Sequence, residues 1–270
     1  MRGGKVNKLT SSQNMRVKNI LHLREKRERD KTSLFLIEGY REIERAVSSG
    51  VVFESFYYCP PFFLGSNEEK LIDQIKAPLF ELSEELFKKV SYRDRPDGLL
   101  GVAYQMKTTL QDLKQKENAL YVIAEAIEKP GNLGTILRSS DAVGADGVIV
   151  CDRCTDIYNP NVVRASVGTL FTLPVIESSS QEVFEWLKKE KIQTVATTPF
   201  ASLNYTDANL LSSVAIVVGT EQLGLSDFWL NSADISVSIP MKGIADSLNV
   251  ATATTLLLYE VLRQRRYSIL

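Results

Sequence analysis

Histidine and cysteine are both scarce in this sequence of 270 residues. His22 is the only histidine, and the three cysteines cannot form an even disulfide framework. The first scarcity argues against a metal site, and the second favours a reducing compartment, which we expect to be the cytoplasm. Cys151 and Cys154 form a C-x-x-C pair. Because zinc needs four ligands and no second pair exists, we interpret them as ordinary cysteines at a strand end.

Long apolar runs and a strong net charge are also absent. No uninterrupted apolar segment approaches the roughly 20 residues that a membrane helix needs, and there is no secretory signal pattern. The net charge of −1 does not by itself point to nucleic acid. No G-x-G-x-x-G follows a predicted strand, which ranks a dinucleotide-dependent dehydrogenase last among the candidate functions. With 44% hydrophobic and 24% charged residues, the composition is that of one large or two modest globular domains.

The charges are nevertheless unevenly distributed. Residues 1–31 contain ten Lys or Arg and three acids, and the first 24 residues contain no acid. We expect residues 1–13 to form a basic arm that contacts RNA phosphates. Two alternatives are a solvated, partly disordered terminus and a transit peptide to the mitochondrial matrix. Gly3 and Gly4 disfavour the transit peptide, because they break its expected amphipathic helix early.

The first half of the chain alternates short apolar strands with helices. This alternation predicts a small α/β domain over residues 14–107, with a mainly parallel sheet. The expected helices are 14–30, 40–48, 67–76 and 83–90, and the expected strands are 33–38, 51–58, 78–82 and 98–106. Charged residues 93–95 precede Pro96, and we interpret them as a solvated turn.

The polar segment 108–118 lacks strong periodicity and is interpreted as a linker. From residue 119 to residue 270 the alternation resumes, and its short strands rich in β-branched residues are typical of a buried parallel sheet. The expected strands are 119–124, 147–151, 169–175, 193–197, 213–218 and 234–239. The expected helices are 134–143, 159–166, 181–191, 226–231 and 248–266.

Three stretches in this second half share one pattern. They read P-G-N-L-G-T-I-L-R at 130–138, V-V-G-T-E-Q-L-G-L-S at 217–226 and I-P-M-K-G-I-A-D-S-L-N-V-A-T-A at 239–253. Each passes from a strand end through a Gly-containing loop into a helix. Since ligands of open α/β sheets bind at strand ends, the three loops predict one composite site.

In this order, the three stretches resemble the three motifs of the SpoU family, which are S-adenosylmethionine-dependent RNA ribose 2′-O-methyltransferases of the SPOUT superfamily. The resemblance implies a SPOUT-type parallel sheet with a C-terminal trefoil knot, S-adenosylmethionine as methyl donor and no metal. Residues 35–43 and 96–102 resemble a ribosomal-protein-like α/β substrate-binding domain that is often fused to such enzymes.

The resemblance assigns five catalytic residues. Arg138 is the proposed catalytic residue of the family; because a guanidinium does not readily deprotonate, we expect it to hold a phosphate and stabilise alkoxide charge. Glu221 is expected to hold Asn132 or the RNA, or else to be an acid at a helix start. Ser247 is expected to hold the ribose hydroxyl or to cap a helix, and Asn249 to hydrogen-bond the second-motif loop.

Other residues are expected to bind the cofactor and the RNA. The cofactor pocket, an apolar slot for the adenosyl group, is assigned to Thr197, Thr198, Val218, Gly219, Ile239, Met241 and Leu248. Gly219 is expected to let the backbone approach a ligand closely. Glu38 and Arg41, which flank a turn, are expected to bind RNA together with Arg138. The structural alternative for this pair is a helix-start Glu and a surface Arg.

Taken together, the sequence predicts an RNA 2′-O-ribose methyltransferase acting on structured RNA, and specifically on ribosomal RNA because of the N-terminal domain. The alternatives are a tRNA 2′-O-methyltransferase and a non-catalytic RNA-binding assembly factor on the same fold. The final helix is too apolar for a single buried stripe, so we expect a homodimer interface on it. The alternative is a fully buried core helix.

Overall fold

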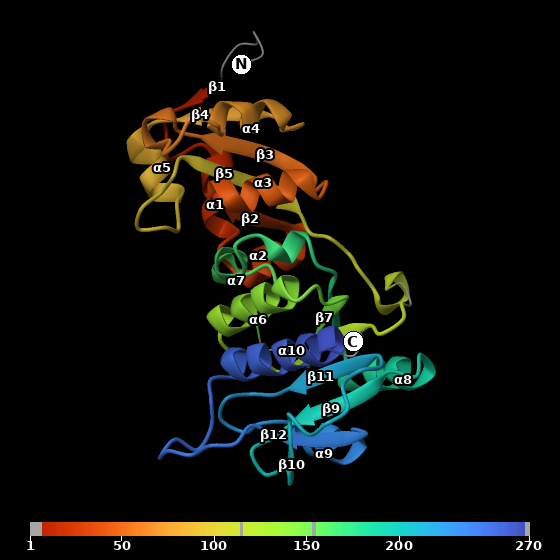
Figure 1. Cartoon of the computed structure of the whole chain (residues 1–270). Helices are drawn as coiled ribbons and strands as arrows, with labels where there is room; N and C mark the ends of the chain where they lie inside the picture. The colour runs from red at the N-terminus through yellow and green to blue at the C-terminus, as the bar shows by residue number, and fades with distance from the viewer. Residues whose placement is uncertain (1–6, 114–115, 153–154, 268–270) are drawn as a thin grey trace. The chain divides into compact units, whose positions relative to one another are not determined.

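The computed structural model describes residues 7–113, 116–152 and 155–267 (Figure 1). The chain forms two compact units. The first combines Met1–Met106 with Asp156–Thr172, and the second combines Lys107–Thr155 with Leu173–Leu270. A short segment from the middle of the chain is therefore part of the N-terminal unit. No helix among the described residues is both long enough and apolar enough to cross a membrane.

The N-terminal unit contains a five-stranded sheet in the order β1-β4-β3-β5-β2. Its strands are β1 (Asn7–Leu9), β2 (Leu34–Glu38), β3 (Phe53–Tyr58), β4 (Leu79–Leu82) and β5 (Leu99–Tyr104). The expectation of a mainly parallel sheet is wrong here, because β5 runs antiparallel to both β2 and β3. Glu81 of β4 and Leu99 of β5 both pair with Tyr58, the last residue of β3, so β5 begins at the end of the sheet where β4 stops. Strand-helix alternation favours a helix that returns the chain to the start of a parallel strand, so it cannot predict this antiparallel strand.

The helices of this unit pack around the sheet. They are α1 (Met15–His22), α2 (Lys26–Thr32), α3 (Tyr40–Ser48), η1 (Pro60–Phe62), α4 (Glu68–Gln74), α5 (Glu84–Val90), α7 (Pro160–Ser166) and η3 (Thr169–Phe171). The single helix expected over residues 14–30 is two helices. The chain turns after Leu23, whose side chain is buried in the core beside Val17 and Ile20.

Part of the expected basic arm belongs to the sheet of this unit. Residues 1–6 lie outside the described residues, but Asn7–Leu9 form the edge strand β1, which pairs in parallel with β4. Arg24 donates to the carbonyl oxygens of Lys89, Val90 and Ser91 at 3.2, 3.0 and 2.8 Å. Asn7–Leu9 and Arg24 therefore stabilise the fold, which the count of basic residues alone could not reveal.

The strand expected over residues 169–175 is also wrong. Residues 169–171 form a 3-10 turn, and the strand is β8 (Val175–Ser178). Val167 and Gly168 have φ of 52° and 83°, so the chain turns sharply before it. A Cβ on Gly168 would lie 3.1 Å from Glu42 Cα, so this turn packs tightly against α3.

The second unit contains a seven-stranded sheet in which every pairing is parallel, as expected. The strand order is β10-β12-β9-β11-β6-β7-β8. The strands are β6 (Leu120–Glu125), β7 (Gly147–Cys151), β8, β9 (Gln193–Thr197), β10 (Leu203–Asn204), β11 (Val214–Val218) and β12 (Ile235–Ser238). The helices are η2 (Leu110–Asp112), α6 (Pro130–Ala142), α8 (Ser180–Lys189), α9 (Asp227–Ser232) and α10 (Val250–Tyr267).

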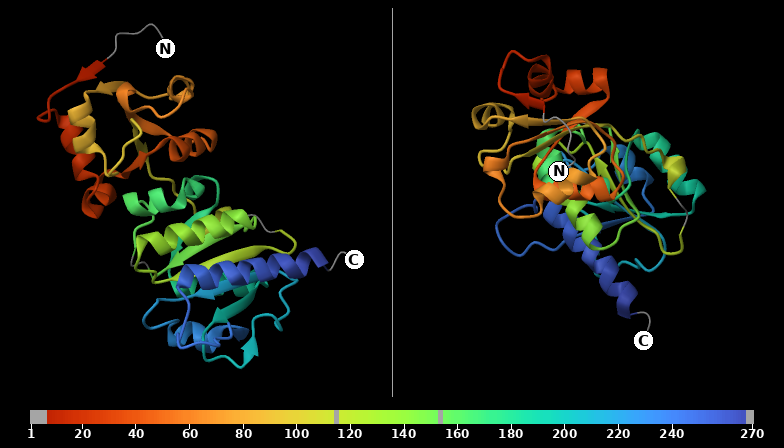
Figure 2. Two further views of the ribbon diagram at one scale, coloured as in Figure 1. Left: turned by 60° about the vertical axis from the view of Figure 1, so that its left-hand side comes forward. Right: turned by 90° about the horizontal axis from the view of Figure 1, so that it is seen from above.

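Helices cover both faces of this sheet. Alternate strand residues such as Tyr121 and Val217 form a core with Leu187 of α8 and Trp229 of α9. On the other side, α6 packs on β7 and α10 packs on β11 (Figure 1). The long helix α10, blue in both views of Figure 2, also packs against α6, and Ser139 Oγ lies 2.6 Å from Thr255 Oγ1 at that contact.

The segment interpreted as a linker begins as part of this unit. Leu110 is buried in the same core as Tyr121, and Leu113 packs against that core. Thr109 and Asp112 form a capping box around η2. Over residues 108–113 the chain is therefore anchored to the sheet by apolar burial, which its polar composition conceals.

Candidate active site

Neighbouring strands of the parallel sheet deliver the three stretches to one edge. Strand β11 pairs with β6 up to Val218 and Ala124, and β9 pairs with β12 up to Thr197 and Val237. The first stretch, residues 130–138, follows β6. The second, residues 217–226, begins at the end of β11, and the third, residues 239–253, follows β12. Because carboxyl ends of parallel strands share an edge, the three loops emerge together, where open α/β sheets bind ligands.

Asn249 joins all three stretches. Its Nδ2 donates to Asn132 Oδ1 at 3.1 Å and to Glu221 Oε1 at 3.3 Å. Its Oδ1 accepts from the backbone N–H groups of Ala251 and Thr252 at 3.0 and 3.3 Å, which makes Asn249 the N-cap of α10. One side chain thus fixes the start of α10 and links the first and second stretches.

Glu221 is held from its other side by Lys129, which sequence reasoning missed. Lys129 Nζ and Glu221 Oε2 form an ion pair. The hydrogen bond and the negative charge of Glu221 raise the pKa of Lys129. Glu221 lies in a loop well before α9, so it is not an acid at a helix start. The available signal was that Lys129 directly precedes the first stretch.

A second missed residue, Glu125, anchors the end of the second stretch. Glu125 is the last residue of β6 and is buried. Its carboxylate accepts from Ser226 N at 2.9 Å and from Ser226 Oγ at 2.6 Å. The loop between β11 and α9 is therefore fixed at its helix end, where Ser226 bonds to the end of β6.

Two buried polar atoms at this edge have no hydrogen-bond partner among the described residues. They are Asn132 Nδ2 and Thr197 Oγ1. Asn132 was expected in a loop, but α6 begins at Pro130, so Asn132 lies in the first turn of that helix. Since a buried polar group without a partner is costly, both atoms are candidates for ligand contacts.

The residues assigned to the cofactor come from the same strand ends. Thr197 ends β9, Val218 ends β11, and Ile239 directly follows β12. Thr198 N donates to Val237 O at 3.0 Å, so the chain after β9 stays on the sheet. Val218 is buried and Ile239 is half-buried. Gly219, half-buried Met241 and exposed Leu248 continue the second and third stretches.

The structure gives Gly219 a local explanation that the sequence did not reveal. A Cβ there would lie 2.2 Å from Gly224 O and 2.6 Å from Leu225 N. Thr220 and Gly224 exchange backbone hydrogen bonds of 2.9 and 3.1 Å, which close this loop on itself. The glycine is therefore required by the loop's own backbone, whether or not a ligand also approaches it.

Arg138 and Ser247 lie apart from the Asn249 network. Arg138 is exposed on α6. It follows Asn132 by six residues, which at 3.6 residues per turn places it about 9 Å further along the helix and about two-thirds of a turn around it. Ser247 is exposed, and the expectation that it caps the last helix is wrong, because Asn249 fills that role. Neither side chain hydrogen-bonds to another described residue.

Comparison with known proteins agrees with this geometry. Residues 119–259 match the model of the SpoU rRNA Methylase family, and residues 14–101 match the model of an MRM3-like substrate binding domain. The chain belongs to the SpoU rRNA methylase family.

Three relatives of this SpoU chain extend over nearly its whole length. The 23S rRNA (uridine(2479)-2′-O)-methyltransferase of Streptomyces viridochromogenes is 32% identical, over 88% of this chain and 85% of its own. The 23S rRNA (guanosine(2553)-2′-O)-methyltransferase RlmP of Bacillus subtilis (strain 168) is 30% identical, over 94% and 98%. An AdoMet-bound rRNA methyltransferase from Sinorhizobium meliloti has a TM-score of 0.89 and 31% identity, over 97% and 99%.

Of the two residues expected to bind RNA in the N-terminal unit, Glu38 is wrongly assigned. Its side chain is fully buried, accepts from Tyr92 N at 3.0 Å and is hydrogen-bonded by the Ser91 hydroxyl. Burial raises the pKa of its carboxyl. Glu38 therefore holds the turn at 91–92 and cannot reach RNA. Arg41, by contrast, is exposed.

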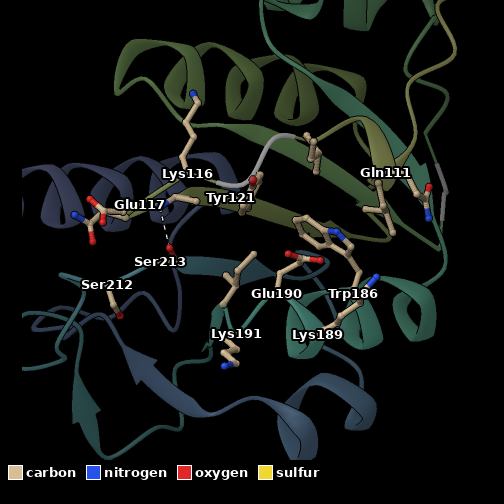
Figure 3. Close-up of a pocket in the computed structure, with 15 residues that line it drawn as sticks. Gln111, Lys116, Glu117, Tyr121, Trp186, Lys189, Glu190, Lys191, Ser212 and Ser213 are labelled. Carbon is tan, nitrogen blue, oxygen red and sulfur yellow. Dashed lines mark hydrogen bonds between the residues drawn. The ribbon is translucent and has the colours of Figure 1, made fainter.

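A hollow of about 810 Å³ in the second unit lies elsewhere (Figure 3). It is lined by residues before the first residues of β6, β9 and β11, including Ala119, Ile192 and Ser213, together with Trp186 and Lys189 of α8. This is the amino edge of the parallel strands, opposite to the edge that carries the three stretches. In open α/β sheets the ligand site is at the carboxyl edge, so size alone does not identify the active site here.

Proposed function

We propose that this protein transfers a methyl group from S-adenosylmethionine to the ribose 2′-hydroxyl of a ribosomal RNA nucleotide. The observation that carries the proposal is the bridge from Asn249 to Asn132 and Glu221, which unites the three SpoU stretches at the carboxyl edge. The relatives support both the RNA class and the reaction. The Streptomyces viridochromogenes relative acts on a uridine and the Bacillus subtilis relative on a guanosine, so the relatives do not identify the target base.

The residues at the strand ends suit the cofactor. Val218, Ile239, Met241 and Leu248 offer apolar surface for adenine, as an adenine pocket requires. The buried hydroxyl of Thr197 has no partner among the described residues and is available to a polar group of the ligand. Thr198 and Gly219 complete the pocket in this proposal. When bound, S-adenosylmethionine supplies an electrophilic methyl group.

The remaining side chains prepare the RNA. Arg138 binds the phosphate beside the target ribose and offsets the negative charge that grows on the 2′ oxygen as its proton leaves. It does not act as the base, because a guanidinium keeps its proton. Ser247 holds the 2′-hydroxyl and relays its proton to water. Asn132, Glu221 and Asn249 keep the loops in the geometry that in-line transfer needs.

We propose that the two domains have separate tasks. Residues 14–107, together with the segment 156–172 that packs with them, capture RNA. The rest of residues 119–270 carries out methyl transfer, with the trefoil knot formed by the C-terminal part. The knot proposal is supported by the return of the chain from β12, near one end of the sheet, to α10, which packs on β11. Free thiols at Cys59 and Cys151 suit the cytoplasm.

We further propose a homodimer that uses α10. Leu256 and Tyr259 on this helix are 38% and 50% exposed, although its other face is buried. Exposed apolar residues on one helix face are typical of a subunit interface. Light scattering should give the mass of two chains, and Leu256→Glu with Tyr259→Glu should give one. A wild-type monomer would contradict the proposal.

The first test of the function is calorimetric titration of the purified protein with S-adenosylhomocysteine. We expect saturable binding near one site per chain. Mapping of 2′-O-methyl groups in a deletion strain should then show the loss of one modification from ribosomal RNA, whereas a loss from tRNA would contradict the assigned substrate. Absence of binding at millimolar ligand by folded protein would favour a non-catalytic assembly factor.

A further inference from the structure

A second hollow lies entirely within the N-terminal unit. It has a volume of about 560 Å³, within the range of ligand sites. Its walls come from the start of α3, the turn before α4, the segment 93–97 and α7. We propose that this N-terminal hollow receives one unpaired nucleotide of the RNA, with Arg41 and Arg164 on its phosphate and Asp97 and Glu68 on its base. This proposal rests on the proposed function and names the site in the N-terminal unit that binds the RNA.

The carboxylates supply acceptors that the protein leaves unused. Asp97 is 8% exposed; its Oδ2 accepts from Tyr40 N at 2.8 Å, but its buried Oδ1 has no donor among the described residues. Glu68 is 4% exposed; its Oε1 accepts from Leu64 N and Gly65 N at 3.0 and 2.7 Å, and its buried Oε2 has none. Each carboxylate is thus fixed by one oxygen and offers the other to a donor.

The arginines supply positive charge and hydrogen-bond donors to the same hollow. Arg41 and Arg164 are exposed, line the hollow and form no ion pair with another described residue. Arg93 also lines it but is occupied, because it pairs with Glu42 at 2.7 Å and donates to Glu38 O. Two guanidinium groups near unsatisfied carboxylates fit a ligand that is anionic at one end and carries N–H donors at the other. A nucleotide has this combination.

A metal ion would use the carboxylates but not the arginines. Among the described residues there is no group of three His, Cys, Asp or Glu that could hold one. The rim also offers surface for a base, since Leu64, which is 83% exposed, and half-buried Tyr40 both line the hollow. Unstacked RNA bases are read by such surfaces together with hydrogen bonds to their edges. Carboxylate acceptors favour bases with an amino group over uracil.

The hollow is also held rigid. Gly39 has φ of 112°, and a Cβ there would lie 2.3 Å from Arg93 Nη2, so the Glu42–Arg93 pair fills the space above this glycine. Arg45 donates to Val167 O, which ties the turn after α7 to α3. The backbones of Arg41 on α3 and Arg164 on α7 are therefore kept at a fixed separation, so only the side chains have to become ordered when the nucleotide binds.

The full-length protein should be tested by saturation-transfer NMR with the four nucleoside 5′-monophosphates. Excess S-adenosylhomocysteine keeps adenine out of the cofactor site. We expect GMP, AMP and CMP to receive more saturation than UMP. Arg41→Gln combined with Arg164→Gln should abolish the signal for all four. Glu68→Gln keeps the oxygen that accepts from Leu64 and turns the free oxygen into a donor, so it should remove the preference for amino-bearing bases.

Filter binding of transcribed 23S rRNA provides the second measurement. The double arginine variant should bind about 10-fold more weakly, with a salt slope lower by about 0.7 because one phosphate loses its contacts. Lys76→Gln, exposed in the same unit, is the control for charge and should bind as wild type. Equal saturation in wild type and variants, or an unchanged slope, would overturn the assignment of the hollow. The affinity for S-adenosylhomocysteine tests the second unit. Loss of cofactor binding would therefore contradict the proposed function independently of the result for the N-terminal hollow.

Discussion

Arg29 and Asp156 form a buried ion pair across 127 positions of the chain, with Arg29 Nε and Nη2 lying 2.8 and 2.6 Å from Asp156 Oδ2. Arg29 is 1% exposed and also donates to the carbonyl oxygens of Leu23 and Arg24. Asp156 Oδ1 accepts from Tyr158 N at 2.9 Å. A residue of the basic N-terminal segment thus fixes the short mid-chain segment that joins the first unit.

Removing one partner of this pair should be costly. Asp156→Ala leaves the Arg29 charge buried without a counterion, so the free energy of unfolding should fall by about 3–5 kcal/mol. Urea unfolding followed by circular dichroism measures the change. The control is Lys26→Ala, which breaks a pair with Asp30 at 2.9 Å whose side chains are about half exposed and should cost less than about 1 kcal/mol. Equal losses of unfolding free energy in Asp156→Ala and Lys26→Ala would contradict the inference that the buried pair stabilises the fold more than the exposed one.

The capping and bridging roles of Asn249 can be separated. Asn249→Asp keeps an N-cap oxygen for Ala251 and Thr252, but it loses the donor to Asn132 and faces the carboxylate of Glu221. Methyl transfer to rRNA should fall about 100-fold, because the loops lose their alignment, while the thermal midpoint stays near wild type.

Asn249→Ala should lose both roles. Its unfolding free energy should fall by about 1 kcal/mol, the usual cost of an N-cap, and its activity should fall as far as that of the Asp variant. If Asn249→Asp were as active as wild type, the donated hydrogen bonds would have no part in the reaction.

Cys151 should be inert in the folded protein. Its thiol is fully buried, and burial raises its pKa to about 12. Iodoacetamide at pH 8 should leave Cys151 unmodified in native protein, as read by peptide mass mapping, and should modify it in urea. Cys154 lies outside the described residues. Native labelling of Cys151 would indicate a reactive thiol and reopen a role for the C-x-x-C pair.

The same burial has a pH consequence. The folded state keeps the thiol proton while the unfolded state loses it near its ordinary pKa of about 8.5. The unfolded state therefore binds fewer protons above that pH, and stability should fall as pH rises from 8 to 10.5. Cys151→Ala should show a smaller fall over this interval.

The sequence predicted the elements that local pattern controls and missed those that distant partners control. The parallel sheet and the three strand-end stretches were readable, because strand periodicity and loop residues are local. Arg29 and Glu38 look like surface charges in the sequence, but each is buried by a partner far along the chain. Lys129 and Glu125 escaped notice because their roles depend on which strands are neighbours.

Arg138 provides the decisive test of the reaction. It is exposed and has no partner among the described residues, so Arg138→Ala should leave the free energy of unfolding within about 0.5 kcal/mol of wild type. Loss of a phosphate contact and of charge stabilisation should nearly abolish methyl transfer to rRNA. Affinity for S-adenosylhomocysteine, measured by calorimetry, should remain nearly intact, since the cofactor residues lie at the strand ends. Arg138→Lys keeps a charge without the fork that binds phosphate at two points, so it should restore only part of the rate. A large loss of cofactor affinity in Arg138→Ala would instead place this arginine in the cofactor pocket.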